Sequence, residues 1–144
     1  MLRKKSKGQA IVELSLVFPF FLLIIVGGII DFGFAFYNYL SLQQIANDTA
    51  QWAADTLQTS DAAISTFVNN KKPAWWKGTF TLYAVERSTL PITGGKVVRI
   101  KLGYESQTYT PFYQAMLKAA TGDPDIKLVA LASYKEPQYV KTRF

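Results

Sequence analysis

The chain of 144 residues contains no cysteine and no histidine. Disulfide bonds and thiolate chemistry are therefore excluded, and the commonest general base and metal ligand of proteins is missing. The sequence also lacks an HExxH motif and a glycine-rich loop that runs into Lys-Ser or Lys-Thr. Asp123 and Asp125 flank Pro124, which is typical of a turn rather than of a metal site. We therefore expect no cofactor, no bound metal and no enzymatic activity.

Positive charge is concentrated at the start of the chain. Four of the sixteen Lys and Arg residues precede Gly8, and the remaining twelve nearly balance the ten Asp and Glu residues. No broad basic face is indicated, so we expect no nucleic-acid partner. Residues 1–8 are interpreted as a basic leader, which the positive-inside rule places in the cytoplasm.

One long apolar run follows the leader. Leu14 to Ile30 is free of charge over seventeen positions, or about 25 Å of helix at about 1.5 Å per residue, which is near the lower limit for crossing a bilayer. Asp31 interrupts the run before aromatic residues resume. We expect residues 9–36 to be the transmembrane part of a helix surrounded by membrane lipid. Residues 37–144 would form an exported domain, and Asp31 would lie at the membrane edge, where its charge reaches water.

Glu13 is the unusual feature of this segment. A plain signal anchor has no need of a carboxylate there. A cleavable secretory signal is disfavoured because Glu13 falls where the apolar region should begin and no clear small-x-small site follows at the usual distance. In a type IV pilin-like signal, a basic leader ends in Gly, cleavage follows that Gly, and Glu is the fifth residue of the mature chain. Gly8, Gln9 and Glu13 have this spacing.

The stretch "GQAIVELSLVFPFFLLIIVGGIIDFGFAFYNY" resembles the N-terminal signature of TadE-like proteins, the pseudopilins of tight-adherence (Flp-type, type IVc) pilus systems. Its elements are Gly8 to Glu13, the Phe18-Pro19 step, and the membrane-edge element Asp31-Phe32-Gly33. A weaker resemblance continues through "VVRIKLGYESQTYTPFYQ" and "IKLVALASYKEP". The insert around "NNKKPAWWKGT" is not required by the family pattern.

The resemblance implies a structural or accessory (minor pilin) subunit of a tight-adherence type IV-like pilus, which can leave the membrane for the extracellular filament. It implies cleavage between Gly8 and Gln9 by a prepilin peptidase. It also implies that Glu13 pairs with the N-terminal amine of a neighbouring subunit. The implied partners are the peptidase, the major pilin, other pseudopilins and the inner-membrane assembly platform. The alternatives are that Glu13 only marks the membrane edge, and that the chain is a signal-anchored exported scaffold or binding module that never enters a filament.

Proline and glycine residues interrupt the predicted span. Pro19 removes one backbone donor and clashes with the Ser15 carbonyl, which produces either a harmless kink or a bend that sets register in a filament. Gly27, Gly28 and Gly33 offer small surfaces for close helix packing, although glycine is also simply tolerated in membrane helices.

Helical periodicity continues beyond the membrane, so one helix is predicted from about Ala10 to Gln58. One apolar stripe recurs at spacings of three and four residues: Leu42, Ile45, Ala46, Thr49, Ala50, Ala53 and Leu57. A short second helix is predicted in "TSDAAISTFVNN" with Ser60 as N-cap. In the loop that follows, Trp75 and Trp76 are either buried anchors or a contact surface.

The rest of the chain is predicted to be mostly strand. "TFTLYAVE" and "KVVRIKLGY" flank a turn at Gly94-Gly95, "TPFYQAMLKAATG" is a helix closed near Gly122, and "DPDIKLVALASYK" is a third strand. The predicted fold class is α+β. A long N-terminal membrane-spanning helix packs against a small three-stranded antiparallel sheet with one or two short helices, as in pilins.

Overall fold

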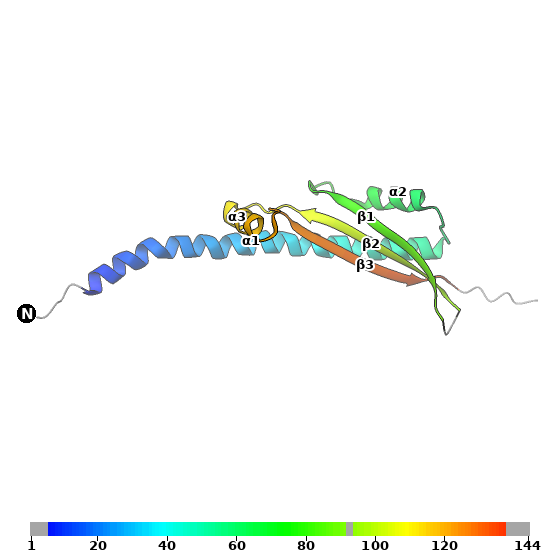
Figure 1. The fold of residues 1–144 in the computed structure, drawn as a ribbon, viewed down its shortest axis with the longest axis horizontal. Coiled ribbons are helices and arrows are strands. Elements are labelled where there is room, and N and C mark those ends of the chain that lie inside the picture. Colours follow the sequence, from blue (N-terminus) through cyan, green and yellow to red (C-terminus); the bar gives the residue numbers. More distant parts are fainter. Residues whose placement is uncertain (1–5, 92–93, 138–144) are drawn as a thin grey trace, which may run out of the picture.

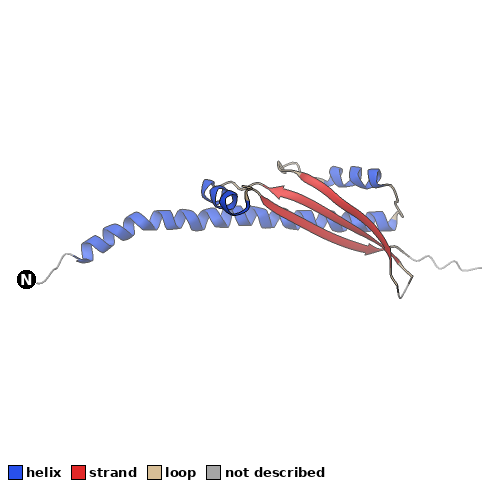
Figure 2. Cartoon of the chain, viewed as in Figure 1, coloured by secondary structure: helices blue, strands red, loops and turns tan. Residues whose placement is uncertain are grey.

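The computed structural model describes residues 6–91 and 94–137, so Arg3, Lys4 and Lys5 of the leader lie outside the described part. The elements in chain order are α1 (Ser6–Asp55), α2 (Asp61–Lys71), β1 (Phe80–Thr89), β2 (Lys96–Ser106), α3 (Pro111–Thr121) and β3 (Ile126–Lys135). Helix α1 is the spine of the molecule, and the other elements gather on its C-terminal part while its N-terminal part projects freely (Figures 1 and 2). The predicted α+β architecture is confirmed.

The sheet is antiparallel in the order β1-β2-β3. In the centre, Ile100 of β2 pairs with Val85 of β1 and Ala132 of β3. The hairpin between β1 and β2 is closed by the N–H of Leu90, which donates to the carbonyl of Gly95 over 2.7 Å. Gly94 has a φ of 63°, a conformation that glycine adopts at no steric cost, so the predicted turn is confirmed in the part that the structure describes.

The core lies between the sheet and the C-terminal third of α1. Val98, Ile100 and Leu102 of β2 are buried against Ala46 and Ala50 of the helix. Small alanines at these positions bring the helix backbone close to the strands, so branched strand side chains fill the space between them. The predicted apolar stripe of α1 is therefore the core-forming face of the helix.

Leu57 is the exception to the predicted stripe, because it is 48% exposed. The helix ends at Asp55, before this residue. The N–H of Gln58 then bonds the Ala53 carbonyl and the N–H of Leu57 bonds the Ala54 carbonyl, the pattern of a Schellman cap. Leu57 takes the left-handed conformation that this cap requires, with a φ of 50°, which turns its side chain away from the stripe.

Helix α2 begins where the sequence predicts, since the Ser60 side chain accepts a hydrogen bond from the N–H of Ala63. In the loop after α2, the two tryptophans differ. Trp76 is buried and stacks on Tyr104 with ring centroids 4.0 Å apart, as predicted for a loop anchor. Trp75 is exposed, so it is not a buried anchor, and its ring contacts Tyr37 of α1.

Helix α3 has Pro111 in its first turn and ends at Gly122, whose φ of 81° is left-handed. The predicted turn after it is confirmed, because the N–H of Asp125 donates to Oδ1 of Asp123 over 3.0 Å. Burial and the neighbouring Asp123 raise the pKa of the Asp125 carboxyl. Helix α3 lies beside the middle of α1 and not over the sheet (Figure 1), which decides the geometry of the candidate site.

Candidate functional site on the N-terminal helix

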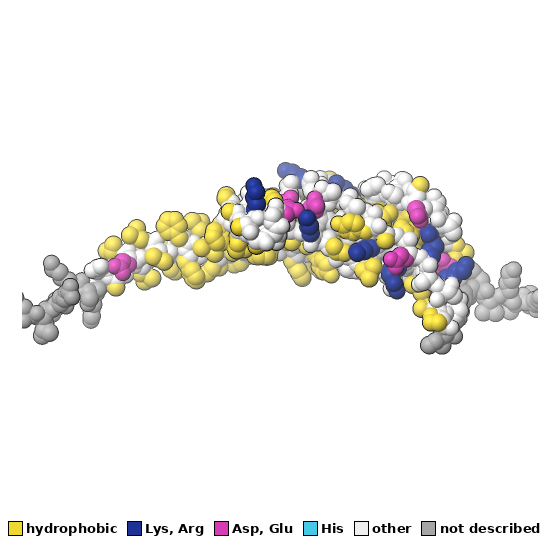
Figure 3. Space-filling model, in the orientation of Figure 1, with side chains coloured by type: hydrophobic (Ala, Val, Ile, Leu, Met, Phe, Trp, Pro, Cys, Tyr) yellow, Lys and Arg dark blue, Asp and Glu magenta, His cyan; other side chains and the backbone are white. Residues whose placement is uncertain are grey.

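The N-terminal part of α1 is a bare apolar helix. Every residue from Gly8 to Val26 is exposed, including bulky side chains such as Phe20 and Leu23. In Figure 3 hydrophobic side chains cover this half except for one acidic side chain near its free end, whereas the lysine, arginine and other acidic side chains gather over the domain. This is the one helix in residues 6–91 and 94–137 that is long and apolar enough to cross a membrane. The core helix of a water-soluble protein would have these side chains buried.

Glu13 is exposed near the start of this bare segment and is the one acidic residue between positions 6 and 30. Its Oε1 atom accepts a hydrogen bond from the Gln9 side-chain amide over 3.0 Å, one helical turn away. Gly8 is already helical, and a Cβ atom there would meet no other atom within 4 Å. Thus Gly8, Gln9 and Glu13, which the sequence singles out, lie together at the free end of α1. Their roles in processing and assembly remain predictions.

Pro19 lies inside α1 without ending it. The ribbon curves along the N-terminal stretch that contains it (Figure 1), as a proline inside a helix is expected to cause. The nearby Ser15 hydroxyl donates to the Ile11 carbonyl over 2.8 Å. The bend is therefore carried by an exposed segment, where it reorients the free end without disturbing the core.

Asp31 does not reach water, so the expectation that its charge would is wrong. The residue is 1% exposed, although it lies directly after the apolar run from Leu14 to Ile30. Its carboxylate accepts hydrogen bonds from the N–H of Tyr109 over 2.7 Å and from the N–H of Thr110 over 3.2 Å. The Thr110 hydroxyl donates to it as well. The segment between β2 and α3 folds back over α1 and covers the carboxylate.

The start of α3 is a favourable partner for this carboxylate. Backbone N–H groups at a helix N-terminus are unpaired and carry the positive end of the helix dipole, so they attract an anion. Thr110 is the N-cap of α3, but its side chain makes no cap hydrogen bond within its own helix and bonds Asp31 instead. Each partner of this contact is unusual in the sequence: Asp31 is a charge beside an apolar run, and Thr110 precedes the proline that starts a helix. The sequence gives no indication that residues 79 positions apart meet.

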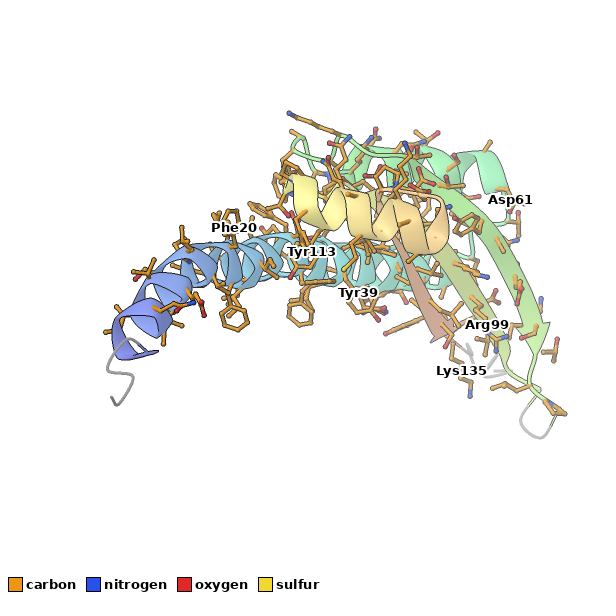
Figure 4. The ribbon with its side chains drawn as sticks, turned by 60° about the vertical axis from the view of Figure 1, so that its left-hand side comes forward. Phe20, Tyr39, Asp61, Arg99, Tyr113 and Lys135 are labelled. Carbon is orange, nitrogen blue, oxygen red and sulfur yellow. The ribbon has the colours of Figure 1, made fainter. Side chains whose placement is uncertain are left out.

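Two small residues complete the contact between α1 and α3. A Cβ atom on Gly28 would lie 2.5 Å from the Tyr113 hydroxyl oxygen, and one on Gly27 would lie 3.3 Å from Thr110 Cγ2. Tyr113 projects from α3 toward α1 (Figure 4), and its hydroxyl donates to the Ile24 carbonyl over 3.0 Å. The predicted close packing at Gly27 and Gly28 is confirmed, with α3 of the same chain as the partner.

Gly33 packs against nothing, because a Cβ atom there would meet no atom within 4 Å. The α3 clamp therefore consists of the Asp31–Thr110 hydrogen bonds, the Tyr113–Ile24 hydrogen bond and the close contacts at Gly27 and Gly28. It holds the middle of α1 to the domain and leaves the segment before Ile24 free.

Aromatic side chains surround α1 just beyond the clamp. Three rings of α1 each meet one ring from the domain: Phe32 with Tyr113 at 5.5 Å between centroids, Phe34 with Tyr109 at 5.1 Å, and Tyr37 with Trp75 at 6.1 Å. We call these six residues the aromatic collar. The sequence shows that aromatic residues resume after Asp31, but the rings that the domain supplies could not be identified without the fold.

The collar borders a shallow pocket of about 220 Å³ that Asn38 and Tyr104 also line. Asn38 is buried, donates to Ser106 Oγ over 3.0 Å and accepts a hydrogen bond from the Trp76 indole over 2.9 Å. Burial raises the pKa of the neighbouring Tyr104 hydroxyl. No group of three or more acidic, histidine or cysteine residues that could hold a metal ion occurs in residues 6–91 and 94–137.

In a comparison with protein families, the family model for TadE-like protein matches residues 8–51. The matched segment takes in nearly all of α1, from the free end through the clamp and collar positions to the core-forming alanines. The resemblance carried by Gly8 to Glu13, Phe18-Pro19 and Asp31-Phe32-Gly33 is thereby confirmed, because all three elements lie within the segment that is similar to this family. No curated protein and no solved structure matches the chain.

Proposed function

We propose that this chain is a TadE-like pseudopilin, a structural, non-enzymatic subunit of a tight-adherence pilus that is anchored in the membrane by α1 before assembly. One observation carries the proposal. The part of α1 that matches the family begins as a bare apolar helix with a single carboxylate, Glu13, near its free end.

The bare helix needs an apolar environment. Burying one large aliphatic or aromatic side chain is worth about 1.5–3 kcal/mol, and almost every residue from Gly8 to Val26 lacks tertiary cover. Lipid meets this need before assembly, and the helices of neighbouring subunits meet it in a filament. The segment is also an integral part of the fold, because the α3 clamp holds it from Ile24 onward. A transient targeting peptide would need no such attachment.

Glu13 supplies specificity in this proposal. A carboxylate in hydrocarbon costs at least about 2.5 kcal/mol, so it favours a cationic partner. Removal of residues 1–8 by a prepilin peptidase creates such a partner, the free amine of Gln9 on a neighbouring subunit. The further partners are the major pilin, other pseudopilins and the inner-membrane assembly platform, with the N-terminus cytoplasmic and the domain outside.

The test of this role is incorporation into filaments. Glu13→Ala and Glu13→Gln should both reduce the amount recovered with sheared filaments or crosslinked to the assembly complex, normalised to membrane content. Because Glu13→Gln keeps shape and hydrogen bonding but forms no ion pair, it should be nearly as defective as Glu13→Ala. Membrane levels and leader cleavage should be normal for both variants.

Glu86→Gln is the matched control, since it makes the same chemical change on an exposed side chain of β1 and should leave incorporation unchanged. Wild-type incorporation of both Glu13 variants would contradict the proposal. The chain would then be better described as a signal-anchored exported scaffold or binding module.

The orientation is tested separately. The chain has no cysteine, so single cysteines introduce unique labels. A cysteine at the exposed Ser133 of β3 should react with an impermeant thiol reagent on intact cells. In a Gly8→Val background, which should retain the leader, a cysteine at Ser6 should react only after permeabilisation. The reverse pattern would contradict an N-terminus in the cytoplasm.

A further inference from the structure

Only one side of helix α3 packs against the rest of the molecule. Tyr113 and Leu117 are partly buried on the side facing α1, yet none of the residues of α3 is fully buried. Phe112 and Met116 lie one turn apart, about 40° from each other around the helix, and are 48% and 43% exposed. The polar Gln114 and Lys118 lie on the other side of the helix. An apolar face of α3 is therefore open to the surroundings.

This open face is continuous with the bare part of α1. A groove of about 550 Å³ runs between the two helices. Four α1 side chains, Phe20, Leu23, Ile24 and Ile30, and two residues of α3, Pro111 and Phe112, line most of it. The only polar side chain along the groove is that of Thr110, and its hydroxyl is held by Asp31. The groove thus offers no hydrogen-bonding group to water or to a polar ligand.

The position of α3 along α1 places it at membrane depth. Ile24, which bonds Tyr113, lies eleven residues after Glu13, and Asp31 lies eighteen residues after it. At about 1.5 Å per residue, these positions are about 16 Å and 27 Å along the helix from Glu13. The hydrocarbon core of a bilayer is about 30 Å thick. If Glu13 lies at the cytoplasmic interface, α3 meets α1 within the outer half of the bilayer.

The aromatic collar fits the same depth. It lies about 29–36 Å along α1 from Glu13, and Tyr and Trp side chains are enriched where hydrocarbon meets water. Three of its members, Tyr37, Tyr109 and Trp75, are half-exposed and have both an apolar ring and a polar group. Lys118 on the polar side of α3 can extend toward headgroups, as lysines of interfacial helices do.

We infer that α3 is a second membrane-contacting element, which lies in the outer leaflet with its Phe112–Met116 face among the lipid acyl chains that fill the groove. The inference rests on the proposed anchoring of α1. Asp31 then accepts hydrogen bonds from the backbone N–H groups at the start of α3. Water could not bond these groups at that depth in the membrane. The domain is thereby held on the membrane surface at a fixed depth.

Site-directed spin labelling of the full chain in phosphatidylethanolamine–phosphatidylglycerol vesicles tests the inference. Single nitroxide labels are attached at Phe112→Cys and Met116→Cys on the open face and at Lys118→Cys on the polar side. Leu23→Cys on the bare helix and Thr66→Cys on the exposed side of α2 are the references. The readout is accessibility to oxygen, which concentrates in hydrocarbon, relative to a water-soluble nickel chelate.

Labels at positions 112 and 116 should show an oxygen-to-nickel ratio several-fold higher than labels at 118 and 66, and should approach the ratio at 23. None of the labelled side chains is fully buried, so the domain should fold in each variant, and two labels on one face guard against a local distortion.

Three results would overturn the inference. High nickel accessibility at 112 and 116 with a lipid-exposed label at 23 would place α3 in water, while leaving the anchor and the proposed function intact. Low accessibility to both reagents, with spin–spin broadening, would place a second copy of the chain in the groove. High nickel accessibility at 23 would contradict the membrane anchor itself.

Discussion

The two ends of α1 use apolar residues in opposite ways. Between Gly8 and Val26 the helix presents large side chains outward on every side, and none of them is buried by the domain. Between Leu42 and Ala54 it presents mainly alanines on one face, and these are buried under the sheet. A helix that packs on a sheet needs small residues where backbones approach, whereas a helix surrounded by lipid is apolar on every side. Side-chain size therefore separates the two ends of the helix better than hydrophobicity does.

The clamp region between these ends shares features of both. Apolar side chains such as Ile29 and Ile30 remain exposed there, yet Asp31 and Gly28 are buried against α3. A charge and two glycines would weaken an isolated helix, and here each meets a specific group of the domain. The clamp is the place where the helix changes from lipid-facing to domain-facing, and the following predictions test that division.

The largest effect is expected in the core. Leu42→Ala removes a fully buried side chain and should lower the free energy of unfolding by about 2–5 kcal/mol. Leu40→Ala, two residues earlier on the same helix, removes an exposed side chain and should change it little. Urea denaturation of the detergent-solubilised chain, followed by tryptophan fluorescence, measures both. Equal destabilisation by the two substitutions would contradict the conclusion that Leu42 lies in the core and Leu40 does not.

A smaller effect is expected in the clamp. Asp31→Ala leaves the N–H groups of Tyr109 and Thr110 without their acceptor, which should cost about 1–3 kcal/mol. The loss should appear as faster amide hydrogen exchange in residues 108–114, with little change in β2. Asp55→Ala, which truncates an exposed aspartate at the other end of α1, is the control. Unchanged exchange at the start of α3 would show that Asp31 does not hold this segment.

The smallest effect is expected at the glycines. Gly33→Ala meets open space and should stabilise the helix by up to about 1 kcal/mol. Gly28→Ala gains the same propensity but displaces the Tyr113 hydroxyl from the Ile24 carbonyl, which offsets it by about 1 kcal/mol. Thermal unfolding should therefore rank Gly33→Ala above Gly28→Ala.

A double-mutant cycle sharpens this comparison. Tyr113→Phe should destabilise the wild-type chain and have little further effect on Gly28→Ala, because the hydrogen bond is already lost there. Strictly additive effects would mean that Gly28 and Tyr113 do not act through a shared contact.

Local rules were enough to predict most of the fold. Helical periodicity identified the core stripe from Leu42 to Ala53, the stretch "KVVRIKLGY" was correctly predicted to be a strand, and Gly94 and Gly122 marked a turn and a helix end. These features depend on neighbours within a few residues, so the sequence carries them directly. The free end with Gly8 and Glu13 was also recognisable, because its motif is contiguous.

Contacts between distant segments were not predictable in this way. Asp31 was expected to reach water, because nothing near it in sequence shows that the start of α3 will cover it. Trp75 and Trp76 are adjacent and chemically equal, and only the position of Tyr104 decides which of them is buried. Leu57 continued the stripe by spacing, but the helix had already ended. In each case a tertiary contact or a chain reversal overrode the local pattern.

The mature N-terminus of the protein, isolated from the membranes of pilus-bearing cells, tests the account most directly. Intact-mass analysis and N-terminal sequencing should show a chain that begins at Gln9, with Glu13 as its fifth residue. Gly8→Val, which changes an exposed position with open space around it, should block this cleavage while the protein still accumulates in the membrane. A wild-type chain that retains residues 1–8 in pilus-bearing cells would contradict the account.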